Sequence, residues 1–149
     1  MITDVIFAAF LNCKTKSYLN LSGGLESSSE LSDWRREIQE DYRRRCQSKC
    51  RSIFLEQPNI SATSSLEDLK NANHQLVLGC TIETPQFRSQ LDAVERVSRR
   101  SNGKNGGYIP IRFVPNEKLS MHDKLLLAFD ALTLGEAVPR QNSDRPSNQ

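Results

Sequence analysis

The sequence predicts an α/β (α+β) fold, in which N-terminal helices precede a sheet of roughly three strands and one following helix. Three observations predict it. Apolar residues recur at helical spacing as far as Phe54, β-like stretches begin after His74, and a capped apolar run follows Ser120. The 149 residues fit one domain and leave no room for two well-packed ones.

One short helix followed by a short turn is expected at the N-terminus. Thr3 is placed to cap a helix over Asp4–Asn12, whose acidic first residue lies at the positive end of the helix dipole. The run Val5–Leu11 is apolar nearly all round, so we expect this helix to be buried. A second short turn is expected over Lys14–Leu21, and the serine-rich stretch Leu25–Glu30 predicts a mobile loop.

A long helix gives the clearest periodic signal. Apolar residues recur every three or four positions and predict one apolar stripe, with arginines on the other faces: Leu31, Trp34, Ile38, Tyr42, Cys46, Cys50 and Ile53. Pro58 predicts its end, and Ser64 or Ser65 could cap a short helix through Lys70. The cysteines at 46 and 50 have a spacing that metal sites permit, but their place in the stripe favours small core residues.

Three strands are expected after His74. They cover Gln75–Glu83, Phe87–Val97 and Tyr108–Val114, with a glycine-rich turn over residues 102–107 before the third. The second alternates with period two, with Phe87, Ser89 and Ala93 on one face and Asp92, Val94 and Arg96 on the other. Pro110 indicates that the third strand lies at an edge or begins irregularly.

The last predicted helix begins at a capping box. Ser120 is followed three positions later by Asp123, in place of the usual glutamate, and the apolar run Leu125–Leu132 predicts a buried helix that stops at Gly135. The polar remainder, residues 136–149, has no periodicity and is expected to be disordered. We therefore predict one domain over residues 1–135 and a tail over 136–149.

Composition limits the class of protein. No apolar run approaches the roughly 18 residues that a membrane span needs, and the acidic N-terminus lacks the basic residues of a signal peptide. The four cysteines form no CxxC pair, so reduced thiols are expected. These features predict a cytoplasmic protein. Its two histidines, His74 and His122, have no matched partner for nucleophilic catalysis and are expected at the surface.

Basic residues gather in two places although the net charge is only +2. The first is the arginine-rich part of the long helix, which includes Arg43 and Arg44. The second adjoins the glycine-rich turn and comprises Arg96, Arg99, Arg100 and Lys104. Such clusters can contact the phosphates of nucleic acid, and they can equally be a solvated helix face and a charged loop.

Two segments carry a resemblance to a known family. The stretch Phe10-Leu-Asn-Cys-Lys-Thr-Lys-Ser-Tyr-Leu19 resembles the opening element of RecB-like nucleases in the PD-(D/E)XK superfamily, which are related to CRISPR-associated exonucleases. Tyr108–Pro115 followed by Asp123–Leu132 resembles their third strand and next helix. The resemblance spans about Ile2 to Gly135. It implies an incomplete restriction-endonuclease-like fold with DNA as the partner.

The resemblance also implies a metal-dependent site. In that family, carboxylates on adjacent strands hold Mg²⁺ or Mn²⁺, and a lysine helps to activate the attacking water. Asp92 falls at the first carboxylate position, but Arg112 and Val114 occupy the positions of the second carboxylate and the lysine. Glu117 and Lys118 could replace them only if the strand were bulged or shifted. We therefore expect a degenerate catalytic motif, inactive in this chain alone.

One cofactor and two other functions complete the expectations. Cys13 matches the first cysteine of iron–sulfur members of the family, so a 4Fe-4S cluster would need further cysteines beyond Gln149. The alternative functions are a non-catalytic nucleic-acid-binding module and an interaction subunit that pairs with another chain at an exposed sheet edge.

Overall fold

The structure, a computed structural model of the chain, describes residues 1–23, 30–54, 60–61, 76–97 and 107–138. Its elements in chain order are β1 (Ile2–Thr3), α1 (Asp4–Asn12), α2 (Lys14–Leu21), α3 (Glu30–Phe54), β2 (Ile60–Ser61), β3 (Leu76–Glu83), β4 (Phe87–Val97), β5 (Gly107–Ile111) and α5 (Met121–Ala137). The predicted α/β class is confirmed. The three predicted strands are present, whereas the two-residue strands β1 and β2 were not predicted.

Strand β4 is the centre of a mixed five-stranded sheet. One edge of β4 pairs with β3 in an antiparallel hairpin, and β2 pairs in parallel with the start of β3. The other edge is shared by two strands. β1 runs parallel to its beginning at Phe87 and Arg88, and β5 runs antiparallel to its end from Ala93 to Val97.

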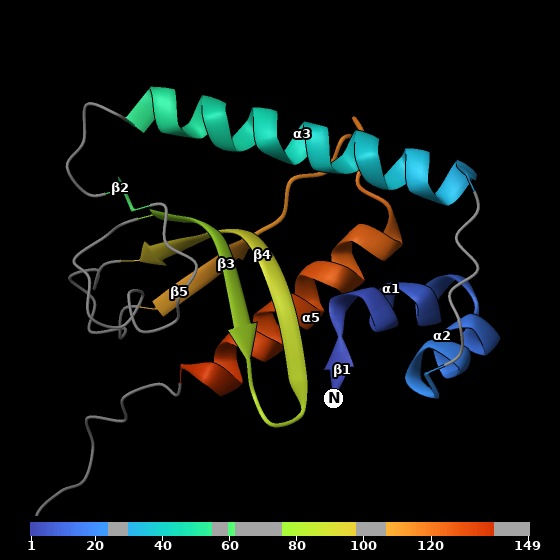
Figure 1. Cartoon of the computed structure of the whole chain (residues 1–149). Helices are drawn as coiled ribbons and strands as arrows, with labels where there is room; N and C mark the ends of the chain where they lie inside the picture. Colours follow the sequence, from blue (N-terminus) through green and yellow to red (C-terminus); the bar gives the residue numbers. More distant parts are fainter. Residues whose placement is uncertain (24–29, 55–59, 62–75, 98–106, 139–149) are drawn as a thin grey trace, which may run out of the picture.

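Helices lie on both faces of this sheet (Figure 1). Successive side chains of a strand point to opposite faces. Phe87 and Ser89 contact α5, whereas Asp92 contacts α3, so these two helices cover opposite sides. Both faces are closed at the middle of β4, where all four residues from Leu91 to Val94 are buried.

The core is built from β3, β4 and α5. Its buried apolar cluster joins both long strands to the helix and comprises Val77, Cys80, Ile82, Leu91, Val94 and Leu134. An aromatic group extends it toward α1, because the Phe129 ring stacks on Phe7 with 4.9 Å between centroids and meets Phe87 edge-on at 5.7 Å. Offset-stacked and edge-to-face geometries are the favourable ones for aromatic pairs.

The N-termini of α1 and α5 are capped by the residues that the sequence predicts. Thr3 Oγ1 accepts the Ile6 N–H at the start of α1. Ser120 and Asp123 form the expected reciprocal capping box at the start of α5. Helix α5 does not stop at Gly135, however, but continues to Ala137. Leu134 is buried in the core, and this packing offsets the cost of about 1 kcal/mol that an interior glycine carries.

Three predictions about burial are wrong. Helix α5 was predicted to be buried, but Leu125, Leu127 and Leu132 are exposed, because only one face of the helix packs on the rest of the fold. In α1 only Ala9 is buried, and Val5 and Phe10 are exposed, because α2, α5 and the sheet together cover only part of the helix surface. In α3 the apolar stripe is not buried along its length, since Leu31, Trp34 and Ile38 are exposed. A helix turns about 100° per residue, so each four-residue step moves the stripe by about 40° around the helix.

Between Trp34 and Cys50 this drift amounts to about 160°. Trp34 and Cys50 therefore lie on nearly opposite sides of α3, and no single surface can cover both. Tyr42, Cys46 and Cys50 are half-buried, and these are the stripe residues that turn toward the sheet.

Several expectations fall outside the described residues. They are the serine-rich loop up to residue 29, the short helix from Ser64 or Ser65 to Lys70, the turn at 102–106 and the tail from 139 onward. Residues 136 and 137, predicted as tail, belong to α5. No helix in the described part of the chain combines the length and apolar character needed to cross a membrane.

Candidate functional site: a buried carboxylate and arginine cluster

The candidate site lies beside β4, where the gap between β1 and β5 leaves one edge of β4 unpaired. Strand β1 leaves the edge of β4 after Arg88, and β5 joins it only at Ala93. β5 ends at Ile111 rather than at the predicted Val114. The next two residues, Arg112 and Phe113, use their polar groups to bind carboxylates instead of continuing the ladder. Polar side chains from four elements therefore meet beside the middle of β4.

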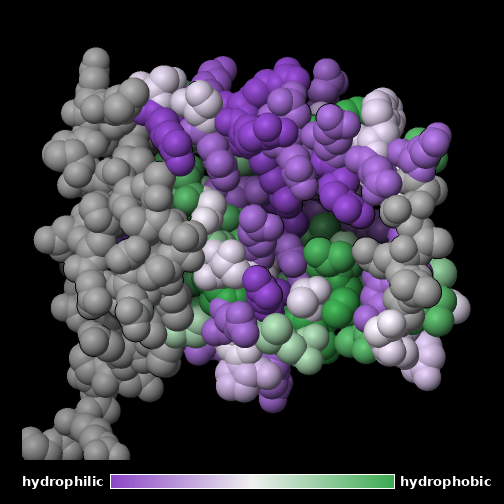
Figure 2. Space-filling view, viewed as in Figure 1, coloured by the Kyte–Doolittle hydropathy of each residue, from purple (hydrophilic) through white to green (hydrophobic). Residues whose placement is uncertain are grey.

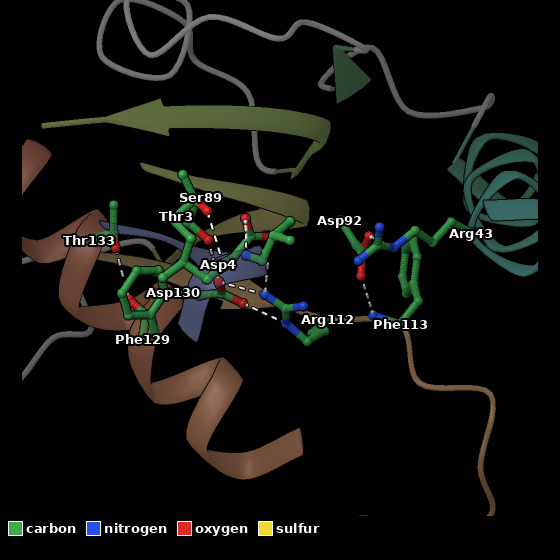
Figure 3. Close-up of polar contacts among 12 residues, drawn as sticks. Thr3, Asp4, Arg43, Ser89, Asp92, Arg112, Phe113, Phe129, Asp130 and Thr133 are labelled. Atoms are coloured by element: carbon green, nitrogen blue, oxygen red, sulfur yellow. Dashed lines mark hydrogen bonds and ion pairs between the residues drawn. The ribbon is translucent and has the colours of Figure 1, made fainter. Parts of the chain in front are cut away.

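Asp130 and Arg112 form the first part of this cluster (Figure 3). The guanidinium donates from Nε to Oδ2 and from Nη2 to Oδ1, both at 2.8 Å, and the Ser89 hydroxyl donates to the same Oδ1. The Asp4 carboxylate at the start of α1 lies 3.9 Å from Arg112 Nη2. Asp130 is only 1% exposed. The network thus ties α1, β4, the end of β5 and α5 together.

Asp92 and Arg43 form the second part. Arg43 reaches from α3 so that its Nε lies 2.8 Å from Asp92 Oδ1, and the Phe113 backbone N–H donates to Oδ2 at 2.7 Å. The Arg43 contact is close, but it is not aligned as a hydrogen bond, so we treat it as an ion pair. Figure 3 shows Arg43 and Phe113 approaching the carboxylate together. Both carboxylate oxygens of Asp92 are therefore in contact with the protein itself.

Burial acts against the charged forms of Asp92, Asp4 and Arg112. It raises the pKa of Asp92 against the opposing attraction of Arg43, and it raises the pKa of Asp4 against the attraction of Arg112. Burial also works to lower the pKa of Arg112, but hydrogen bonding to Asp130 and the charges of Asp130, Asp4 and Asp92 outweigh it and leave that pKa raised. Arg112 is therefore a permanent cation among three carboxylates.

The residues around Asp92 do not fit the divalent metal site that the family resemblance implies. Mg²⁺ requires free oxygen ligands, and the oxygens of Asp92 face Arg43 and Phe113. Glu117 and Lys118 are exposed in the segment between β5 and α5, and neither appears among the contacts of Asp92. In the part of the chain that the structure describes, no three His, Cys, Asp or Glu side chains gather as metal ligands.

The cysteines are dispersed over the fold and form no disulfide. Cys13, the expected cluster ligand, is exposed between α1 and α2. Cys46 and Cys50 are half-buried on α3, and Cys80 is buried in β3. The described residues place no other potential ligand group around Cys13 that would make a metal site.

The basic residues have different surroundings. Arg43 is taken up by Asp92, whereas Arg44 is exposed on α3 together with Arg45, Lys49 and Arg51. Figure 2 shows hydrophilic residues over the length of this helix. Arg96 is exposed on β4 and interacts with neighbours. Arg99, Arg100 and Lys104 lie outside the described residues.

Sequence reasoning missed Ser89, Arg112 and Asp130 as members of a functional cluster and treated Asp4 only as a helix-dipole residue. A signal was present in the last helix. Asp130 stands among Phe129, Thr133 and Leu134, on the face that turns inward. A carboxylate on a buried face requires a partner, so Asp130 predicts a basic residue nearby.

Comparison with known proteins gave no further assignment. The sequence matched no protein-family model and no curated protein, and the structure matched no solved structure. Function is therefore inferred from the residues and their geometry.

Proposed function

We propose that this chain is a non-catalytic nucleic-acid-binding module whose contact surface is the C-terminal half of α3. The observation that carries the proposal is the separation of charge along this helix. From Tyr42 to Phe54 it has five basic residues and no acidic one. Four of the five are exposed, namely Arg44, Arg45, Lys49 and Arg51. Arg45 pairs with Asp41.

The charge pattern favours phosphates over a solvated helix face of mixed sign. The preceding half of α3, from Glu30 to Asp41, carries five acidic residues and two arginines. A nucleic acid backbone would be repelled there and attracted to the other half. Lysine and arginine contacts to phosphates release bound counterions, so this contact should weaken steeply with salt.

Two contacts support a non-catalytic role. Asp92 is engaged by Arg43 and Phe113, and Arg112 stands where a second carboxylate would be needed. Phosphodiester hydrolysis of the type expected from the sequence requires metal ions held by carboxylates. A positive guanidinium at that position would repel a metal ion rather than bind it.

Descent from a RecB-like nuclease domain is the second part of the proposal. It is supported by the position of Asp92 on the central strand and by the order of β3, β4, β5 and α5, which agrees with that expectation. On this account the chain keeps the nucleic-acid-binding role of such a domain and lacks its metal chemistry.

Strand addition by a partner chain at a sheet edge receives less support. Gly79 has a φ of +69° in the middle of β3 and disturbs the ladder there. Pro110 in β5 has no N–H to offer to an added strand. Both features weaken the edges on which another chain would have to pair.

The test is a binding and cleavage assay on the full chain. Anisotropy of a labelled DNA duplex is measured at about 50 and 200 mM salt, the range over which phosphate contacts lose most of their strength. The same duplex is incubated with the protein and Mg²⁺ or Mn²⁺. We expect salt-sensitive binding and intact DNA. Metal-dependent cleavage, or binding that does not change with salt, would contradict the proposal.

A further inference from the structure

Helix α3 is attached to the rest of the molecule differently from α5. Helix α5 packs closely on α1, β3, β4 and β5, whereas α3 makes much less extensive contact with the other described elements. Its first three turns present Leu31, Trp34 and Ile38 to solvent, and Trp34 is 56% exposed. Apolar packing of the helix on the sheet is therefore confined to the part from Tyr42 onward, where Tyr42, Cys46 and Cys50 are half-buried.

Two polar contacts, made by Tyr42 and Arg43 in the middle of α3, fix the helix. The Tyr42 hydroxyl donates to the carbonyl oxygen of Val114 at 3.1 Å, and one residue later Arg43 pairs with Asp92. Asp92 is 4% exposed and Arg43 is 23% exposed, so this pair is shielded from solvent far more than the other ion pairs of α3. Shielding makes an ion pair sensitive to geometry, because each charge depends on its partner rather than on water.

The sheet provides space for this contact. The pairs Leu78–Ala93 and Cys80–Leu91 flank Gly79 and Asp92, so these two residues lie opposite each other. Residues directly opposite on antiparallel strands share a face. At position 79, β3 thus presents no side chain beside Asp92. Helix α3 passes over this position, and Gln47 Nε2 lies 3.4 Å from where a Cβ of residue 79 would be.

We propose that Asp92 is a positioning residue, which holds Arg43 and thereby fixes the orientation of α3 and of the basic surface on its C-terminal half. The consequence for binding rests on the proposed function, whereas the orientation of α3 does not. The role expected from the sequence, a ligand to a catalytic metal, is replaced by an internal contact between a sheet residue and the helix that carries the basic surface.

The groups that face Asp92 make this role specific. Arg43 approaches from α3, Phe113 N–H from the segment after β5, and the charges of Arg112 and Asp130 act from the end of β5 and from α5. Arg112 is already bound by Asp130 through two hydrogen bonds, so Arg43 is the cation that Asp92 holds. Replacing the carboxylate by an amide keeps an acceptor for Phe113 and removes the attraction to Arg43.

The experiment uses Trp34, the single tryptophan of the chain, as a reporter on α3. Time-resolved fluorescence anisotropy is recorded for the full-length protein, for Asp92→Asn, for Arg43→Gln and for the double variant. Arg43→Gln tests the same pair from the more exposed side, should Asp92→Asn fail to fold. The matched control is Arg36→Gln, which removes an exposed arginine paired within the same helix at 3.6 Å.

We expect a lower residual anisotropy of Trp34 in both single variants, no further loss in the double variant, and no change in the control. Duplex affinity should fall roughly threefold to tenfold in Asp92→Asn, with coupling to Arg43→Gln, as for residues that share one ion pair. A purely structural defect elsewhere would instead make the two single losses add in the double variant.

The outcomes separate this inference from the proposed function. If the parent protein binds no duplex, the proposed function fails, and the Trp34 anisotropy still decides whether Asp92 fixes α3. If the parent binds, and the folded variants keep both its Trp34 anisotropy and its affinity, the positioning role is overturned while nucleic-acid binding stands.

Discussion

The guanidinium of Arg112 binds the carboxylate of Asp130 through two hydrogen bonds of 2.8 Å, and the Arg112 side chain is 9% exposed. Fork-shaped pairing of this kind is the strongest geometry available to an arginine and a carboxylate. Because both charges are buried, each is costly without the other. The pair joins the end of β5 to the middle of α5.

Asp130→Asn should therefore be strongly destabilising. It leaves the Arg112 charge without its main partner, and loss of one member of a buried pair costs about 3–5 kcal/mol. Urea unfolding followed by circular dichroism measures the free energy of unfolding. The control Asp33→Asn removes an exposed partner of Arg36 and should change it by less than about 0.5 kcal/mol. Equal effects of the two substitutions would show that the buried pair has no special role.

Gly79→Ala should cost about 1–2 kcal/mol, because its φ of +69° is a left-handed conformation that a side chain disfavours. Space is not the cause, since the nearest atom to the added Cβ is the flexible end of Gln47 at 3.4 Å. Gly107→Ala, where φ is not positive and no atom lies within 4 Å of the added Cβ, should be nearly neutral in the same urea titration. A neutral Gly79→Ala would mean that β3 relaxes to an ordinary strand.

The capping box of α5 predicts a stability effect with a defined pH dependence. Hydrogen bonds from the Ser120 hydroxyl and the Ser120 backbone N–H lower the pKa of Asp123. Its contribution to stability is therefore present above the ordinary aspartate pKa of 3.8 and is lost as pH falls through the lower folded value. Ser120→Ala should cost about 1 kcal/mol at neutral pH.

The check is a series of unfolding titrations between acidic and neutral pH for the parent, Ser120→Ala and Asp123→Asn. The difference between the parent and Asp123→Asn should shrink as pH falls below 3.8. A difference that stays constant across this range would mean that the Asp123 charge plays no part in the cap.

Asp4 predicts the opposite pH dependence. Its burial raises its pKa, so its contribution to stability is present below 3.8 and is lost as pH rises through the folded value. Asp4→Asn mimics the protonated acid, so this variant should gain stability relative to the parent as pH rises from 3.8. Unfolding titrations of both proteins over this range test the sign. A relative loss would show that the attraction to Arg112, rather than burial, controls Asp4.

Local sequence patterns predicted most of the helices and the long strands, because caps and apolar periodicity involve residues that are close together in the sequence. The bounds of α1 follow from Thr3 and from the apolar run, and the start of α5 follows from Ser120 and Asp123. The strands β1 and β2 could not be predicted in this way. Each has two residues and exists only through pairing with a strand far along the chain.

The candidate site was only partly predictable. The alternation in β4 gave the correct faces for Ser89 and Asp92, but it could not show which residues would reach them. Arg43 and Asp92 are separated by about a third of the chain's length, and Arg112 meets Asp130 only because β5 ends beside α5. The α3 stripe failed for a different reason, since four-residue steps drift around a helix and leave Trp34 and Cys50 on different sides.

The measurement that tests the central claim most directly is the salt dependence of duplex binding by the parent and by Arg44→Gln/Arg51→Gln. These two exposed arginines lie two turns apart on the basic half of α3. The slope of log affinity against log salt should become shallower by about one for each phosphate contact removed, and the affinity should fall. Arg35→Gln/Arg36→Gln, on the acidic half, should leave both unchanged. If both double variants behave like the parent, or if both lose affinity equally, the C-terminal half of α3 is not the nucleic-acid surface.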